Sequence, residues 1–122
     1  MLFRSEKGAE VQTAIFGPQM KGFAESGPEE TRHINRWLVD NCFGDFYTRT
    51  GLTLAEREMI TFCFLYAQGG CEPQLKAHIA ANLRMGNDRE YLSRVVSNTV
   101  PFIGYPRTLN ALSCIREVAT QN

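Results

Sequence analysis

The sequence lacks the features that mark several classes of protein. Its 13 lysine and arginine residues are balanced by 13 aspartate and glutamate residues, so the formal net charge is zero. Nucleic-acid-binding proteins usually carry a basic excess, which is missing here. The longest strongly apolar run, residues 59–67, reaches only about half the length of a membrane span. We therefore expect neither a nucleic acid nor a membrane as partner.

Cysteine and histidine are also scarce. The cysteines are Cys42, Cys63, Cys71 and Cys114, with no Cys-x-x-Cys pair among them. Because only His33 and His78 accompany them, no zinc signature can be written and no metal is expected. The first residues have no apolar stretch of the secretory type, and free thiols are typical of a reducing compartment. The sequence therefore predicts a cytoplasmic protein with free cysteines.

Glycine and proline divide the 122 residues into pieces of helical length, and the chain is long enough for one domain. Apolar residues recur at three- and four-residue spacing, and no stretch shows the alternation of a strand. The predicted fold is all-α with about six helices. They are expected at about 4–16, 29–46, 54–68, 73–85, 88–100 and 106–118. Gly44 interrupts the second of these and predicts a break or a close approach of two backbones.

Two apolar surfaces favour self-association. The helix at 54–68, which begins with a Thr53–Glu56 capping box, is apolar nearly all round. A second apolar surface runs from Pro101 into the final helix. A monomer of this size has little interior in which to hide both, so we expect a homo-oligomer.

Three residues are candidates for chemistry. His78 could act as a general acid or base near neutral pH, or it could be a structural histidine with a hydrogen-bond partner. Glu58 stands where its helix becomes apolar, so its carboxylate needs a partner, which could be Arg49, Arg57 or His78. Cys71 precedes the helix opened by Pro73, where unpaired amides favour a thiolate, although a small buried thiol fits equally well.

Helical spacing limits how these residues can cooperate. At 1.5 Å per residue, Cys71 and His78 lie about 10 Å apart along one face, too far for a direct dyad. Gln74, four residues before His78, is the true helical neighbour of the histidine.

Several blocks of sequence together resemble the carboxymuconolactone decarboxylase family. They are FGDFYTRTGLT (43–53), EREMIT (56–61), QLKAH (74–78), IGYP (103–106) and LNAL (109–112). The resemblance implies the all-helical fold of alkylhydroperoxidase D-like proteins, assembly as trimers or hexamers, and no cofactor. It also implies a single domain, with an N-terminal helical arm over about 1–27 and a family core over about 28–120.

The resemblance also assigns roles. In the decarboxylase-type pattern, His78 is the proton donor, Glu58 is its acid partner, and Arg49 and Gln74 bind substrate, with Gln74 standing where glutamate is usual. The implied activity is cofactor-free acid–base chemistry on a small carboxylate or lactone. In the peroxidase-type pattern, Cys71 is the nucleophile of a thiol-dependent hydroperoxide reductase, with Gln74 in the place of the second cysteine. A third reading is a non-catalytic oligomeric binding protein.

Overall fold

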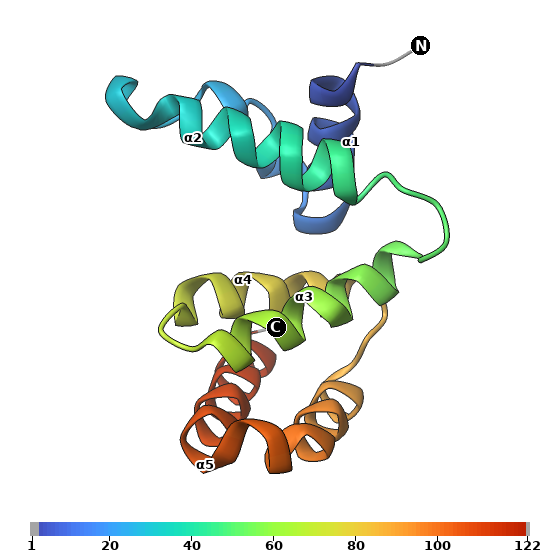
Figure 1. Cartoon of the computed structure of the whole chain (residues 1–122), viewed down its shortest axis with the longest axis vertical. Coiled ribbons are helices and arrows are strands. Elements are labelled where there is room, and N and C mark those ends of the chain that lie inside the picture. Colours follow the sequence, from blue (N-terminus) through green and yellow to red (C-terminus); the bar gives the residue numbers. More distant parts are fainter. Residues whose placement is uncertain (1–2, 122) are drawn as a thin grey trace. The chain divides into compact units, whose positions relative to one another are not determined.

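A computed structural model describes residues 3–121, which fall into two compact units that divide between residues 53 and 54. Within the described residues every regular element is a helix, and the all-α prediction is confirmed. Over the same residues, no helix combines the length and the apolar character needed to cross a membrane. The ribbon in Figure 1 follows the elements from α1 to α5.

The N-terminal unit contains α1 and a long composite helix. Its elements are α1 (Arg4–Phe16), the 3₁₀ turns η1 (Pro18–Met20), η2 (Phe23–Glu25) and η3 (Glu29–Thr31), α2 (Arg32–Trp37) and the π-helix η4 (Leu38–Phe46). The helix predicted at 29–46 is therefore present, but it changes type along its length. Its second half is π-helical, a form that is rare and usually short in proteins.

Glycine explains how α1 packs on η4. A Cβ placed on Gly44 would lie 2.4 Å from the backbone oxygen of Arg4, and one placed on Gly8 would lie 2.1 Å from the backbone oxygen of Val39. Such distances are far inside van der Waals contact, so only residues without a side chain fit here. The close approach of backbones predicted at Gly44 is confirmed, and Gly8 is its partner on α1.

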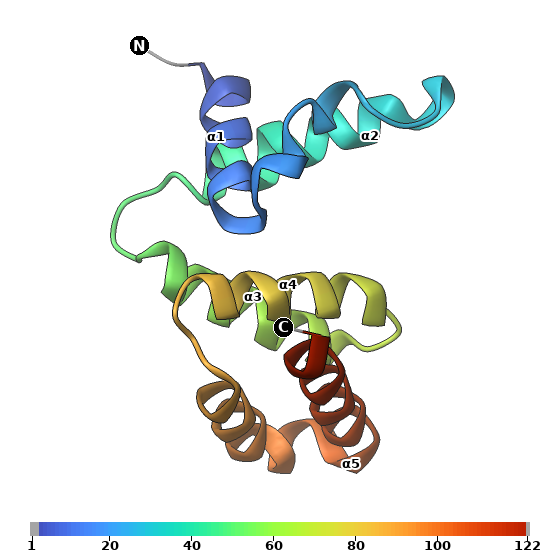
Figure 2. The same cartoon turned by 180° about the vertical axis from the view of Figure 1, so that it is seen from behind.

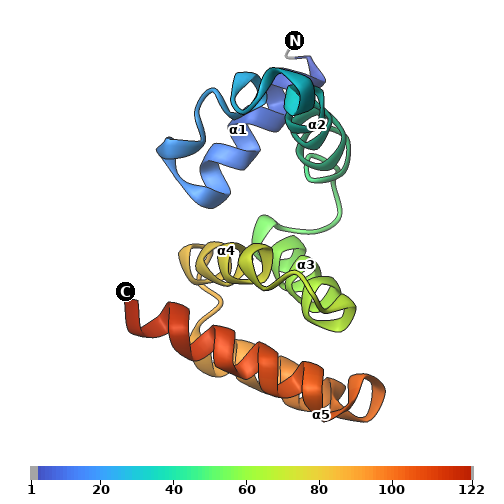
Figure 3. The same cartoon turned by 90° about the vertical axis from the view of Figure 1, so that its left-hand side faces the viewer.

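The C-terminal unit consists of α3 (Leu54–Gln68), α4 (Glu72–Arg84) and α5 (Arg89–Gln121). Figures 1 and 2 show α3 and α4 side by side and antiparallel. Helix α5 is interrupted at Gly104, whose φ of 77° and ψ of 176° are not helical. Its two halves fold back on each other, as Figure 3 shows, so the sequence correctly predicted two helices here.

One apolar core joins all three helices of this unit. Its buried members are Phe62, Tyr66, Leu75, Ile79, Leu92, Val96, Ala111, Cys114, Ile115 and Val118. Helix α3 is apolar nearly all round but is not buried on every side, because the Phe64 side chain is 70% exposed. Phe102 and Tyr105, beside the break in α5, are also exposed. The C-terminal unit therefore shows large apolar side chains at its surface.

Candidate active site

The structure joins two of the predicted catalytic residues. Glu58 on α3 places Oε2 2.8 Å from Nδ1 of His78 on α4. The Glu58 side chain is completely buried, while the His78 side chain is 15% exposed. A buried acid therefore holds a histidine that still reaches the surface. Of the three partners considered for Glu58, His78 therefore makes a direct contact with it.

The positions of both residues follow from helix geometry. Glu58 lies on the same stripe of α3 as Phe62 and Tyr66, at four-residue spacing, and all three are buried. The chain reverses through Gly69 and Gly70, whose φ values of 74° and 73° are left-handed and suit glycine. This turn brings α4 back along α3, so that the middle of α4 lies beside the start of α3.

The contact defines the state of the imidazole. When Glu58 is ionised its oxygen can only accept, so Nδ1 of His78 then carries the hydrogen and donates it to Glu58. The opposite ring nitrogen, Nε2, is then the one that exchanges protons with another molecule. The pair is therefore suited to general acid–base catalysis.

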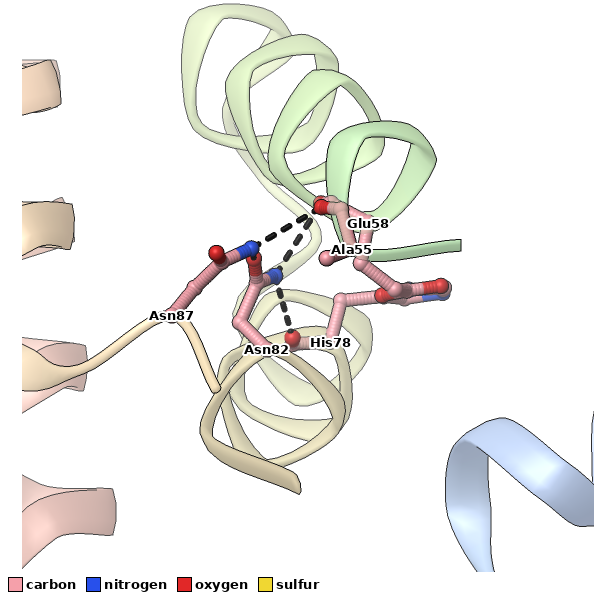
Figure 4. A network of polar contacts seen from close by, with 5 residues as sticks. All are labelled: Ala55, Glu58, His78, Asn82 and Asn87. Atoms are coloured by element: carbon pink, nitrogen blue, oxygen red, sulfur yellow. Dashed lines mark hydrogen bonds and ion pairs between the residues drawn. The ribbon is translucent and has the colours of Figure 1, made fainter. Parts of the chain in front are cut away.

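Two asparagine side chains lie beside the main chain of this pair. Asn82, fully buried on α4, donates from Nδ2 to the backbone oxygens of Glu58 (3.0 Å) and His78 (2.7 Å). Asn87 donates from its own Nδ2 to Asn82 Oδ1 and to the Ala55 oxygen, each at 2.9 Å. Figure 4 shows the two amides lying between α3 and α4, on the other side from the Glu58 and His78 side chains.

Sequence reasoning gave these asparagines no functional role. One signal could have identified Asn82: it is a polar residue on the buried stripe of α4, four residues after His78. Buried amides need partners, and those of Asn82 include the backbone oxygens of Glu58 and His78.

Cys71 lies apart from this pair. It immediately precedes α4, and its Sγ donates to the backbone oxygen of Leu65 at 3.3 Å. The thiol lines a cavity of only about 10 Å³, near the minimum that holds one water. Gln74 is exposed on the first turn of α4, one turn before His78. The structure therefore places Cys71 against α3 and Gln74 at the surface.

Arg49 belongs to the N-terminal unit. Its guanidinium carbon lies 4.5 Å from the centre of the Phe46 ring, in a cation–π contact. It lines an open groove of about 430 Å³ together with Arg4, Lys7, Asn41, Gly44, Asp45, Phe46 and Thr48. This groove is larger than the cavity at Cys71, but the Glu58–His78 pair does not line it. Its size alone does not make it the reactive site.

Two further groups in the C-terminal core titrate outside the neutral range. Burial raises the pKa of Tyr66 to about 12, and a hydrogen bond to Thr99 at 2.7 Å lowers it in part. Burial also raises the pKa of the Cys63 thiol. Both groups keep their protons near pH 7 and are not suited to acid–base exchange there. Across residues 3–121, no group of three or more His, Cys, Asp or Glu side chains could hold a metal ion.

The model of the carboxymuconolactone decarboxylase family matches residues 33–117, which include Glu58, His78 and both asparagines. No curated protein matches the chain.

Proposed function

Because the chain belongs to the carboxymuconolactone decarboxylase family, we propose that Glu58 and His78 catalyse cofactor-free acid–base chemistry of the decarboxylase or lyase type. The substrate class is a small carboxylate or lactone. The observation that carries this proposal is the 2.8 Å contact between a completely buried carboxylate and a partly exposed histidine. The burial of Glu58 restricts it to acting through His78, so Nε2 of His78 is the group that meets the substrate.

The proposed step is a proton transfer coupled to loss of carbon dioxide. The bond between the substrate carbon and its carboxylate breaks, and its electron pair stays on the carbon. Nε2 of His78 delivers a proton to that carbon, so that the products are carbon dioxide and the protonated compound. Glu58 stabilises the imidazolium before the transfer and keeps the ring oriented during it. The imidazole then recovers a proton from water.

Two residues stay predicted members of the substrate site. Gln74 is exposed one turn before His78, and Arg49 has the charge to hold a carboxylate.

The test compares matched variants on a panel of small lactone acids and β- or γ-keto acids. Release of carbon dioxide is followed for the natural protein and for His78→Gln and Glu58→Gln. Each substitution should lower the rate by about 10²–10⁴-fold, the usual contribution of a positioned acid or base. His33→Gln is the control, because His33 is the other histidine and is exposed on α2.

A rate that survives in both His78→Gln and Glu58→Gln would refute the assignment. The same proteins are assayed with a hydroperoxide and excess dithiol, beside Cys71→Ser. Turnover that depends on Cys71 and is indifferent to His78 would replace the proposed chemistry by thiol peroxidation.

A further inference from the structure

The amide of Asn82 bridges the two residues of the proposed catalytic pair through their main chains. Its Nδ2 lies 3.0 Å from the backbone oxygen of Glu58 and 2.7 Å from that of His78. Glu58 and His78 are on different helices, so one side chain sets the spacing of α3 and α4 at the point where the pair meets.

The bonding pattern fixes how this amide is turned. The Ala55 backbone oxygen can only accept, so the Asn87 group facing it at 2.9 Å is its Nδ2. The same Nδ2 faces Asn82, whose nearest atom must then be the accepting Oδ1, also at 2.9 Å. Both Nδ2 hydrogens of Asn82 are therefore directed at the two backbone oxygens. The amide of Asn82 has its donors and its acceptor engaged although it is completely buried.

Asn87 ties this arrangement to the end of α4. Its backbone nitrogen donates to the backbone oxygen of Asn82 at 2.9 Å, just after Gly86 at φ 96°. This is the bond pattern that closes a helix with a left-handed glycine. The Asn87 side chain then reaches Ala55 in the first turn of α3. The turn after α4 is thereby attached to the start of α3, one turn before Glu58.

We propose that Asn82, supported by Asn87, is a positioning residue that sets the distance and orientation of the Glu58–His78 contact. This inference rests on the proposed function for what the pair does, but the positioning itself is a property of the protein without substrate. A hydrogen bond weakens steeply when the angle at its hydrogen falls below about 120°, so the orientation of the two groups matters as much as their distance. Displacement of a catalytic group by about 1 Å can lower a rate by about 10²-fold.

The imidazole of His78 reports this positioning directly. With Nδ1–H donating to Glu58, the ring is held in one tautomer and its Nδ1 hydrogen exchanges slowly with water. Ring ¹⁵N shifts and the Nδ1 hydrogen signal measure both properties by NMR. The chain has two histidines, so His33, exposed on α2, is an internal reference in each spectrum. His78→Gln assigns the signals.

The decisive comparison is between Asn82→Ala and Thr108→Val. Thr108 is a buried polar residue of the same unit whose hydroxyl donates to the Gly104 backbone oxygen at 2.7 Å, away from the pair. Asn82→Ala should lose the slowly exchanging Nδ1 hydrogen and show both tautomers. Thr108→Val should keep the natural spectrum even if its melting temperature falls. A folded Asn82→Ala protein with the natural His78 spectrum would overturn the proposal, as would loss of the signal in both variants.

A second variant covers the case in which Asn82→Ala does not fold. Asn87→Ala removes a half-buried side chain and leaves Asn82 its two backbone bonds, so it should fold and raise the exchange rate of the Nδ1 hydrogen several-fold. An unchanged exchange rate of the Nδ1 hydrogen in Asn87→Ala would contradict the role of Asn87. If Asn82→Ala is also unfolded, the same result would contradict the whole proposal. These spectra need no substrate, so they test positioning separately from catalysis. If the variants give the expected spectra but the natural protein turns over no carboxylate, the proposed function is refuted while the positioning role stands.

Discussion

The packing of α1 on η4 predicts that Gly8→Ala lowers stability, whereas helix propensity alone predicts that it raises stability. Gly8 lies within α1 and is buried against η4. From propensity alone, Gly8→Ala should stabilise the helix by about 1 kcal/mol, since alanine is the best helix former. In the structure, the new Cβ would lie 2.1 Å from the backbone oxygen of Val39 and 2.9 Å from the backbone nitrogen of Gly44. No rotamer relieves this clash, because both neighbours are main-chain atoms.

The expected size follows from these two effects. Normal contact between a carbon and an oxygen needs about 1 Å more than the 2.1 Å available, so α1 or η4 must move. Overpacking of this kind costs about 1–3 kcal/mol, and the upper end applies when backbones must separate. After the propensity gain of about 1 kcal/mol is subtracted, Gly8→Ala should lower the stability of the N-terminal unit by about 1–2 kcal/mol.

The assay is urea denaturation followed by tryptophan fluorescence. Trp37 is the single tryptophan and lies on α2, so its emission reports the N-terminal unit. Ala14→Gly, at an exposed position of α1, measures the propensity term in the same helix and should cost about 1 kcal/mol. Gly8→Ala with unchanged or increased stability would show that α1 and η4 are not in close backbone contact.

Three further predictions concern the C-terminal unit. Because burial raises the pKa of Tyr66 to about 12 from an ordinary value of 10.0, the folded state keeps a proton that the unfolded chain releases. The contribution of Tyr66 to the free energy of unfolding is therefore fully present below pH 10 and should fall by up to about 2–3 kcal/mol as the pH rises to 12. Urea denaturation at several pH values measures this fall, which should be absent in Tyr66→Phe. Asp88 Oδ1 accepts from the backbone nitrogen of Tyr91 at 2.8 Å as the N-cap of α5. Asp88→Ala should therefore cost about 1 kcal/mol in thermal unfolding while Asp88→Asn costs little, and equal losses would count against the cap. The exposed side chain of Phe102 is expected to lie in a contact between copies of the chain, so Phe102→Glu should lower the molar mass in light scattering. A natural protein that is already monomeric would contradict that expectation.

Local sequence was sufficient for the helices and for the choice of candidates. Glycine and proline stop helices through backbone geometry that does not depend on distant partners, so the bounds at 4–16 and 54–68 were predicted without the fold. Glu58 was identifiable because a carboxylate inside an apolar pattern needs a partner wherever the chain goes. His78 was identifiable from its chemistry.

The type of helix over Leu38–Phe46 was beyond local sequence. Gly44 indicated a close approach of backbones, but its partner, Gly8, lies 36 residues earlier, in a helix with its own pattern. Periodicity of apolar residues does not distinguish a π-helical turn from an α-helix over so short a stretch.

The helices and the residues able to exchange protons could be predicted from local sequence, because both depend on groups close together in the chain. Which of these residues meet depends on how the helices pack. Glu58 had three possible partners, and the antiparallel packing of α3 on α4 gave it His78. The same packing buried Asn82 between the two helices and turned the Cys71 thiol to the Leu65 carbonyl. These contacts join residues on separate helices, and their register is set by the side chains that fill the core.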